Sequence, residues 1–342
     1  MSRFAVIGLD HRHVFEMTGE LIAAGMQCAG YWPETTDPRV LAGFRKRFPD
    51  LPEVADRRRL LENAEVDLIV TAAVPRDRAA LAVEAMRHGK DVMADKPGVT
   101  SFAELGELRQ AAAETGRIFS VCFSERFQVP AVEEALSLVR SGAIGRVVQT
   151  TSLAPHRLNA AIRPSWFFDT AAHGGILCDI GSHQIDQFLV LTGSPDAKIV
   201  QASTAGFGAL PAPGFENFGE IVLRSASAAG YVRVDWFTPD GMPTWGDGRL
   251  FIVGTEGTIE LRKYVDLAGR PGTDHLFLAD QAGVRYIGCG NRPWSYFRRF
   301  AADVRDRTET AMPQEHVFTV CRLALEAQAK AAYLTLPGGM PA

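Results

Sequence analysis

The sequence predicts an α/β protein in two parts. The first is an N-terminal doubly wound parallel sheet, and the second is an α+β part with a large, mainly antiparallel open sheet. Apolar strands alternate with amphipathic helices in the first third of the chain, strand-like segments follow one another from residue 197 to residue 287, and helical segments close the sequence. The length of 342 residues fits two domains of roughly 150 residues each.

Strands and helices alternate up to residue 123. The expected strands are Phe4–Ile7, Gln27–Tyr31, Leu68–Ala72, Val92–Ala94 and Ile118–Phe123, and the expected helices are Val14–Ala24, a helix from Pro75 to near Gly89, and Phe102–Thr115. Gly25 and Gly116 each follow a helix, at the position where a left-handed glycine often ends one. Short connections favour parallel pairing with right-handed crossovers, so we assign residues 1–123 to a first, dinucleotide-binding domain.

The pattern changes after residue 123. Helices are expected at Pro130–Arg140, Gly174–Leu191, Pro293–Thr308 and Gln314–Leu334, and strands at Val147–Ala154, Ile199–Thr204, Phe218–Leu223, Tyr231–Phe237, Leu250–Val253, Thr258–Leu261, His275–Ala279 and Val284–Ile287. Consecutive strands with short turns predict an antiparallel meander in a second domain, residues 124–342. We expect its open face, with Val232, Val234 and Trp236 or their alternates, to join copies of the chain as a homodimer or homotetramer.

Composition excludes several functional classes. Apolar residues make up 46% of the chain and charged residues 22%, with a net charge of −4, which argues against disorder and against nucleic acid or anionic membrane as a partner. The five cysteines are scattered without paired spacing, which predicts reduced thiols and no metal site. The N-terminal segment does not have the pattern of a secretory leader, so we expect a cytoplasmic protein.

The turn after the first strand is the first candidate site. A strand that enters a helix through glycine presents N–H groups to an anion, and this turn reads Gly8-Leu9-Asp10-His11-Arg12-His13. Of the three glycines in the dinucleotide-binding fingerprint only Gly8 is present, because Asp10 and His13 occupy the other positions. His11, Arg12 and His13 supply donors and positive charge, so we expect this turn to bind a dinucleotide. The alternative is that Asp10 caps the helix and that nothing binds.

The end of the second strand supplies candidate contacts for the adenosine half of such a cofactor. Tyr31 or Trp32 can stack on adenine. Neither is the carboxylate that accepts hydrogen bonds from the ribose 2′-hydroxyl in NAD-binding proteins, and Glu34 lies several residues further on. The sequence therefore does not separate NAD from NADP.

A lysine follows the strand expected at Val92–Ala94, in the run Asp95-Lys96-Pro97-Gly98. Strand ends in a doubly wound sheet face the ligand crevice, so Lys96 is placed to hold a hydroxyl group or to polarise a carbonyl group. The alternative is a solvated loop lysine beside a turn proline.

The segment from Gly174 to Asp186 opens the helix expected at Gly174–Leu191. Asp179, His183 and Asp186 recur at spacings of four and three residues, so they share one face of a continuous helix. A histidine between carboxylates can serve as an oriented acid or base. The alternatives are a solvent-facing charged stripe and a metal site, for which no third and fourth ligands stand at a supporting spacing.

Substrate contacts are expected from arginine, histidine and aromatic side chains near these segments. Arg126 follows the last strand of the first domain, and a further group precedes the glycine-rich segment: His156, Arg157, Arg163 and Trp166. Aromatic rings suit the apolar faces of a sugar ring, and arginines suit a carboxylate or phosphate on that sugar. Each of these residues can equally serve as a contact between domains.

Two of these motifs resemble the signatures of the glucose–fructose oxidoreductase/inositol dehydrogenase/MocA family. Asp95-Lys96-Pro97 is similar to the family's Glu-Lys-Pro element, and the run Gly-Gly-x3-Asp-x3-His-x2-Asp at 174–186 is similar to its second signature. The resemblance covers nearly the whole chain. It implies that Lys96, Asp179 and His183 occupy the family's catalytic positions, with His183 as the acid or base at the reacting hydroxyl and Lys96 hydrogen-bonded to its oxygen.

The same resemblance implies further roles in the first and second domains. It implies a Rossmann-type first domain that binds NAD or NADP, with cofactor contacts from Lys96 and from Pro75. The loop that holds Pro75 carries Arg76 where the family often places asparagine. The resemblance also implies that Asp186 orients the helix that carries His183, and that it belongs with the expected substrate-binding residues.

From the residues and the resemblance we expect a cytoplasmic NAD(P)-dependent oxidoreductase that acts on a hydroxyl or carbonyl group of a sugar, a polyol or a derivative. Lys96 would reach the substrate from the first domain, and Asp179 and His183 from the second. Two alternatives stay open: an NAD-assisted glycosidase or lyase that uses the same residues, and a non-catalytic regulator that binds a sugar or a nucleotide. The presence of all three side chains favours chemistry, because a binding protein has no need of an acid or base.

Overall fold

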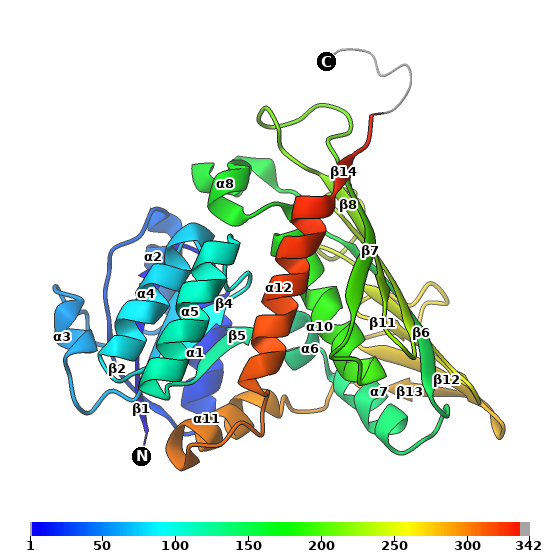
Figure 1. Ribbon diagram of the computed structural model, residues 1–342, viewed down its shortest axis with the longest axis horizontal. Helices are drawn as coiled ribbons and strands as arrows, with labels where there is room; N and C mark the ends of the chain where they lie inside the picture. Colours follow the sequence, from blue (N-terminus) through cyan, green and yellow to red (C-terminus); the bar gives the residue numbers. More distant parts are fainter. Residues whose placement is uncertain (1, 336–342) are drawn as a thin grey trace. The chain divides into compact units, whose positions relative to one another are not determined.

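The computed structural model describes residues 2–335, and these residues divide into two compact units. Unit 1 contains residues 2–122, Pro164–Gly174 and Ser295–Arg322. Unit 2 contains Phe123–Arg163, Gly175–Trp294 and residues 323–335. Each unit is thus assembled from separate stretches of the chain, and both have a sheet as their main element (Figure 1).

Unit 1 is built on a five-stranded parallel sheet of order β2-β1-β3-β4-β5. Its strands are β1 (Arg3–Leu9), β2 (Gln27–Tyr31), β3 (Leu68–Ala72), β4 (Asp91–Asp95) and β5 (Phe119–Cys122). The three central strands β1, β3 and β4 are almost wholly buried, as expected for a sheet covered on both faces. The strand order reverses between β1 and β3, which makes the carboxyl edge beside these strands the switch point of the sheet.

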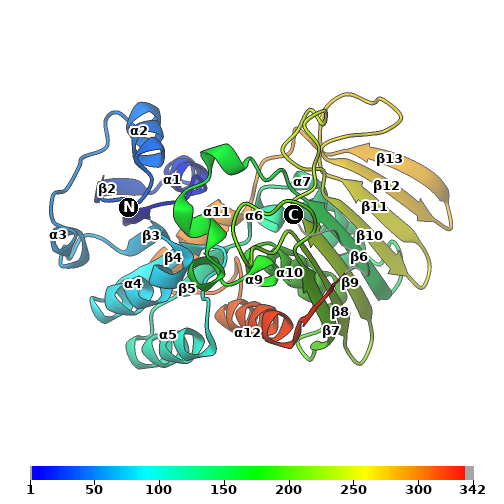
Figure 2. The same cartoon turned by 90° about the horizontal axis from the view of Figure 1, so that it is seen from above.

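The helices of unit 1 pack around this sheet and against one another. They are α1 (Val14–Ala23), α2 (Pro38–Arg47), α3 (Arg58–Leu61), α4 (Pro75–Arg87), α5 (Phe102–Thr115), α8 (Thr170–His173), α11 (Tyr296–Asp306) and the first part of α12 (Gln314–Lys330). Helices α4 and α5 pack together on one face, and α1 packs with α11 on the other (Figure 2). Ser101 and Glu104 form a capping box at the start of α5, and Gly116 ends it in the left-handed conformation. Neither α2 nor α3 was predicted from the sequence.

Unit 2 contains a nine-stranded sheet of order β13-β12-β11-β10-β6-β9-β8-β7-β14. The strands are β6 (Val147–Pro155), β7 (Lys198–Ala205), β8 (Phe218–Arg224), β9 (Ala229–Asp235), β10 (Arg249–Gly254), β11 (Thr258–Arg262), β12 (His275–Asp280), β13 (Gly283–Gly288) and β14 (Ala332–Tyr333). The expected run of strands pairs antiparallel except where β6 inserts between β9 and β10; β6 pairs in parallel with β9 and antiparallel with β10. The edge strand β14 also pairs in parallel, with β7.

Helices α7 (Pro130–Arg140), α9 (Ile176–Asp179) and α10 (Gly181–Thr192) cover one face of this sheet, and the short α6 (Ser124–Phe127) packs against α7 and α10. Val232 and Val234 are buried on the covered face, so the open face carries their alternates Tyr231 and Arg233. In the described chain no helix lies over that open face (Figures 1 and 2).

Two expected helices differ from the structure. The segment Gly174–Leu191 is not one helix: Gly174 and Gly175, both with positive φ, precede α9, and a single turn residue, Ile180, separates α9 from α10. The last helix ends at Lys330 rather than Leu334, and the chain then adds β14 to the edge of the sheet beside β7.

All five cysteines are buried free thiols, as the scattered spacing predicted. Among residues 2–335, no helix combines the length and the apolar character that a bilayer crossing requires.

Gly8 and Gly25 form a matched pair for testing the turn after β1. Both have positive φ, at +93° and +90°, but a Cβ on Gly8 would lie 2.6 Å from Cβ of Ala73, whereas a Cβ on Gly25 would meet nothing within 4 Å. We expect Gly25→Ala to lower the free energy of unfolding by about 1–2 kcal/mol, the cost of the left-handed conformation. Gly8→Ala should cost about 1–3 kcal/mol more, because it adds overpacking. Urea unfolding measures both, and equal losses would contradict the close approach of β1 and β3.

Candidate functional site

The turn that follows β1 is tied to the neighbouring strands through its backbone and through Asp10. The N–H groups of Asp10 and His11 both donate to the carbonyl oxygen of Ala72, at 3.1 and 3.0 Å. The Asp10 carboxylate accepts hydrogen bonds from the hydroxyl groups of Thr35 and Thr36, at 3.2 and 2.7 Å. Asp10 therefore joins the segment after β2 and does not cap α1, so the capping role considered for it is wrong.

A cavity of about 400 Å³ lies at this edge of the sheet. It is lined by Ile7, Gly8, Asp10, Trp32, Glu34, Thr35, Thr36, Arg57, Ala73, Asp77, Ala80, Leu81 and Glu84. These residues lie at the carboxyl ends of β1 and β3, in the segment between β2 and α3, or on α4. The cavity, named here the switch-point cavity, therefore stands where doubly wound folds bind their ligands. Its volume falls within the roughly 300–1,000 Å³ typical of small-molecule sites.

The expected cofactor residues divide between this cavity and other places. Gly8, Asp10 and Trp32 line it. Tyr31 is buried, and its hydroxyl donates to Glu53 at 2.7 Å, while Pro75 is buried at the first turn of α4. Arg12 is exposed at the start of α1. Sequence reasoning missed Thr35, Thr36 and Arg57, which flank α2 and α3, the helices it did not foresee.

Carboxylates dominate the charge of the switch-point cavity. Asp10, Glu34, Asp77 and Glu84 line it, against the single cation Arg57. That guanidinium is itself paired with Glu84 at 3.0 Å and lies 5.6 Å from the ring centre of Trp32. The cavity therefore disfavours a ligand with additional negative charge at this position.

Two imidazoles and one carboxylate meet beside this cavity. Nδ1 of His11 lies 2.8 Å from one oxygen of Asp95, and Nδ1 of His13 lies 2.8 Å from the other. Burial and the neighbouring His13 lower the pKa of His11 to about 3, so this imidazole is neutral at pH 7. Burial alone would raise the pKa of Asp95, but His13, Arg78 and His11 hold it well below its ordinary value. We name this group the His11–His13–Asp95 cluster.

Arg78 fixes the segment that contains Lys96. Its buried guanidinium donates to the carbonyl oxygens of Asp95 and Pro97, each at 3.0 Å, as well as to that of Lys96. The N–H of Lys96 donates to the Asp95 carboxylate at 2.8 Å, the Lys96–Pro97 peptide is cis, and the Lys96 side chain is buried. The backbone at Lys96 is thus held from both sides. Arg78 was not predicted as a site residue; it lies on the buried face of α4.

In unit 2, the signature segment is held by a buried ion pair. Arg126 on α6 makes two hydrogen bonds of 2.7 Å to the carboxylate of Asp186 on α10. Asp186 is fully buried and Arg126 nearly so, which gives the pair the geometry of a structural link. Asp179 ends α9 and His183 lies in the first turn of α10, and Ile180 between them keeps right-handed helical backbone angles. Both side chains are buried.

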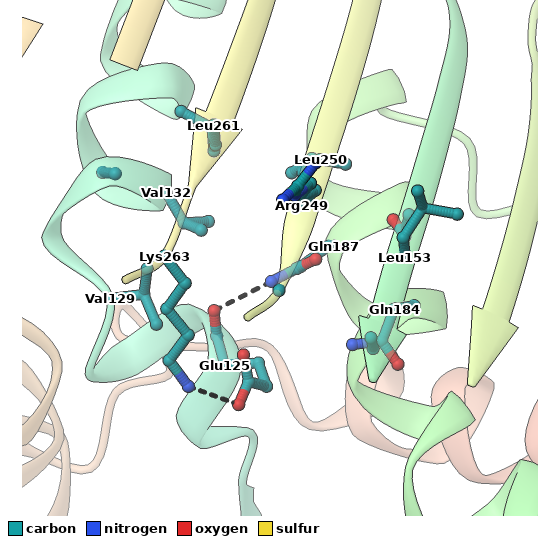
Figure 3. Close-up of a pocket in the computed structure, with 14 residues that line it drawn as sticks. Glu125, Val129, Val132, Leu153, Gln184, Gln187, Arg249, Leu250, Leu261 and Lys263 are labelled. Atoms are coloured by element: carbon teal, nitrogen blue, oxygen red, sulfur yellow. Dashed lines mark hydrogen bonds and ion pairs between the residues drawn. The ribbon is translucent and has the colours of Figure 1, made fainter. Parts of the chain in front are cut away.

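A second buried ion pair stands near His183. Lys263 donates to the Glu125 carboxylate at 2.5 Å, and Gln187 donates to the backbone oxygen of Glu125 at 2.8 Å (Figure 3). Burial alone would raise the pKa of Glu125, but the charge of Lys263, with smaller contributions from His183 and His156, lowers it to about 2. The neighbouring cavity measures about 30 Å³, which holds water rather than a sugar. The pair therefore supplies fixed charge near His183.

The other expected substrate residues gather around two tryptophans of unit 2, with one exception. The ring of His156 lies 4.3 Å from that of Trp245 and 5.5 Å from that of Trp236, and Arg163 lies 5.3 Å from the ring of Trp236. Arg157 donates to backbone oxygens of the segment that precedes Trp245. The exception is Trp166, which belongs to unit 1, where its ring lies 6.3 Å from that of His11.

Both units match models of known protein families. Residues 38–123 match the family model described as "Oxidoreductase family, NAD-binding Rossmann fold", and residues 132–260 match the model "GFO/IDH/MocA C-terminal domain". A crystal structure of a protein from Erwinia carotovora atroseptica is 43% identical, over 98% of this chain and 100% of that chain, with a TM-score of 0.94.

Other relatives are more distant in sequence. The scyllo-inositol 2-dehydrogenase (NAD(+)) of Bacillus subtilis is 27% identical over 268 residues, which are 75% of this chain and 72% of the relative. An uncharacterized oxidoreductase of Schizosaccharomyces pombe is 26% identical over 215 residues, 63% of this chain. The match spans 57% of that relative, less than two thirds of its length.

The Glu125–Lys263 pair yields a stability prediction. Glu125→Gln leaves a buried lysine charge without its partner and should lower the free energy of unfolding at pH 7 by about 3–5 kcal/mol. The double variant Glu125→Gln/Lys263→Met removes both charges and should recover much of that loss. Chemical unfolding followed by circular dichroism gives both values, and a double variant as unstable as the single one would contradict the assignment.

The same pair makes stability depend on acid pH. The pKa of Glu125 is about 2 in the folded chain and ordinarily 4.5, so the unfolded chain binds more protons between these values. The stabilisation is complete above pH 4.5 and is lost as pH falls toward 2, with a slope of up to about 1.4 kcal/mol per pH unit. The double variant should show a shallower acid limb than the wild type, and identical slopes would refute this contribution.

Proposed function

Because the chain belongs to the GFO/IDH/MocA family of oxidoreductases, we propose that it is an NAD(P)-dependent dehydrogenase that acts on a hydroxyl or carbonyl group of a sugar, a polyol or a derivative. The observation that carries this proposal is the switch-point cavity of unit 1, which has the place and the volume of a cofactor site. The substrate class draws support from the scyllo-inositol dehydrogenase relative, whose name states a polyol and NAD(+).

The lining of the cavity fits the adenosine half of the cofactor. Trp32 offers a ring face to adenine, and Glu34 can accept hydrogen bonds from ribose hydroxyls. The start of α1, with the exposed Arg12, offers donors and positive charge to the pyrophosphate. The excess of carboxylates in the cavity favours NAD over NADP, because the 2′-phosphate of NADP would add negative charge there.

We propose that three side chains act on one substrate oxygen. His183 takes the proton from the substrate hydroxyl, or returns it in the reverse reaction, while Lys96 donates a hydrogen bond to the same oxygen. Asp179 acts as the carboxylate partner of this group. When bound, the nicotinamide supplies the acceptor or donor of the hydride. The backbone clamp at Lys96 and the ion pair of α10 support the proposal, because both hold these side chains on fixed elements.

The catalytic roles can be tested with two substitutions. Lys96→Met keeps the aliphatic stem without the charge, and His183→Ala removes the imidazole. Each should lower the rate of NAD reduction, measured by nicotinamide absorbance with scyllo-inositol and a panel of polyols and aldoses, by about 10²–10⁴. Both variants should still bind NADH.

Matched controls lie elsewhere in unit 1. Lys90→Met removes another buried lysine, whose amine donates to the carbonyl oxygen of Asn63, and His88→Ala removes an exposed histidine. Both should keep the wild-type rate. Full activity of Lys96→Met would contradict the proposed role of Lys96, and NADH binding without turnover of any sugar or polyol would favour a regulator.

A further inference from the structure

The His11–His13–Asp95 cluster is a three-ligand arrangement that the proposed reaction does not use. One ligand atom from each residue lies within 4.8 Å of the other two. The cluster combines a turn after β1 with the end of β4, and none of its residues lines the switch-point cavity. We propose that these three side chains bind one divalent transition-metal ion. This inference does not depend on the proposed dehydrogenase activity.

The donor set selects the class of metal. Two imidazole nitrogens and one carboxylate oxygen suit Zn²⁺, Co²⁺, Ni²⁺ and Fe²⁺, whereas Mg²⁺ and Ca²⁺ prefer sites made of oxygen atoms. Three protein ligands leave at least one coordination position for water or for an oxygen of a bound molecule, as in catalytic rather than structural zinc sites. The cluster therefore predicts an exchangeable ligand on the ion.

Hydrogen bonds from two neighbouring groups outside the cluster orient the Asp95 carboxylate. Arg78 donates to one oxygen of Asp95 at 3.3 Å, and the N–H of Lys96 donates to the other at 2.8 Å. Hydrogen bonds of this kind fix a ligating carboxylate and tune its affinity for the metal. Arg78 is buried and makes further bonds to the carbonyl oxygens of the same segment, so Asp95 keeps this orientation without an ion.

The cluster is also accessible to an ion from solution. The side chain of Asp95 is fully buried, but that of His11 is 16% exposed and that of His13 is 34% exposed. The two imidazole rings stand nearly perpendicular, with centres 4.2 Å apart, so they approach the carboxylate from different directions. An ion can thus enter from the side of His13 and replace the protons now shared between the imidazoles and Asp95.

The test is metal binding by the full chain without dinucleotide. After treatment with a chelator and dialysis, the protein is titrated with Zn²⁺ by calorimetry and with Co²⁺ by visible absorption. We expect one ion per chain, and His13→Ala or His11→Ala should weaken binding by at least about 10–100-fold. His88→Ala should bind like the wild type, and Mg²⁺ at the same concentration should not bind at the cluster.

The thermal midpoint keeps the test informative if a variant is less stable. Zn²⁺ should raise the melting temperature of the wild type and of His88→Ala but not that of His13→Ala, because only a native metal site couples binding to folding. Two results would overturn the proposal: the wild type does not bind Zn²⁺ or Co²⁺, or binding survives both histidine substitutions. Either result would mean that the cluster is held by hydrogen bonds alone and is not a metal site. Neither result depends on whether the protein binds NADH.

Discussion

The buried carboxylate of Asp95 is the group on which the carboxyl edge of the unit 1 sheet depends. Its two oxygens accept from His11, His13, Arg78 and the N–H of Lys96, which together use its full capacity for hydrogen bonds. One side chain thereby joins the turn after β1, helix α4 and the segment after β4. Replacing it with an apolar residue would leave the buried Arg78 charge without its carboxylate, a change that costs several kcal/mol in other proteins.

Unit 2 contains two buried ion pairs beside α10, the helix that carries His183. Glu125 and Arg126 are neighbours on α6, yet one pairs with Lys263 after β11 and the other with Asp186 on α10. Two buried ion pairs from adjacent residues fix a short helix between the sheet and α10. His183 lies on α10 between these restraints, which gives the proposed acid or base a rigid support.

Much of the fold could be predicted from the sequence because apolar periodicity reports burial directly. The central strands of both sheets follow this pattern, whereas α2 is rich in charged residues and α3 has only four residues, too few to show a helical period. The start of α9 at Ile176 rather than at Gly174 escaped prediction because spacing alone cannot show that Gly174 and Gly175 both adopt positive φ. The meeting of His11 and His13 with Asp95 spans more than 80 residues of sequence, and only the sheet order brings these residues together.

The central claim is that the switch-point cavity binds NAD(H), and a paired titration with NADH and NADPH tests it most directly. Nicotinamide fluorescence should show binding of NADH in the micromolar range. NADPH should bind at least about 10-fold more weakly, because its extra phosphate faces the carboxylates of the cavity. Absence of binding of either cofactor at millimolar concentration would contradict the account, and tighter binding of NADPH would contradict the charge argument.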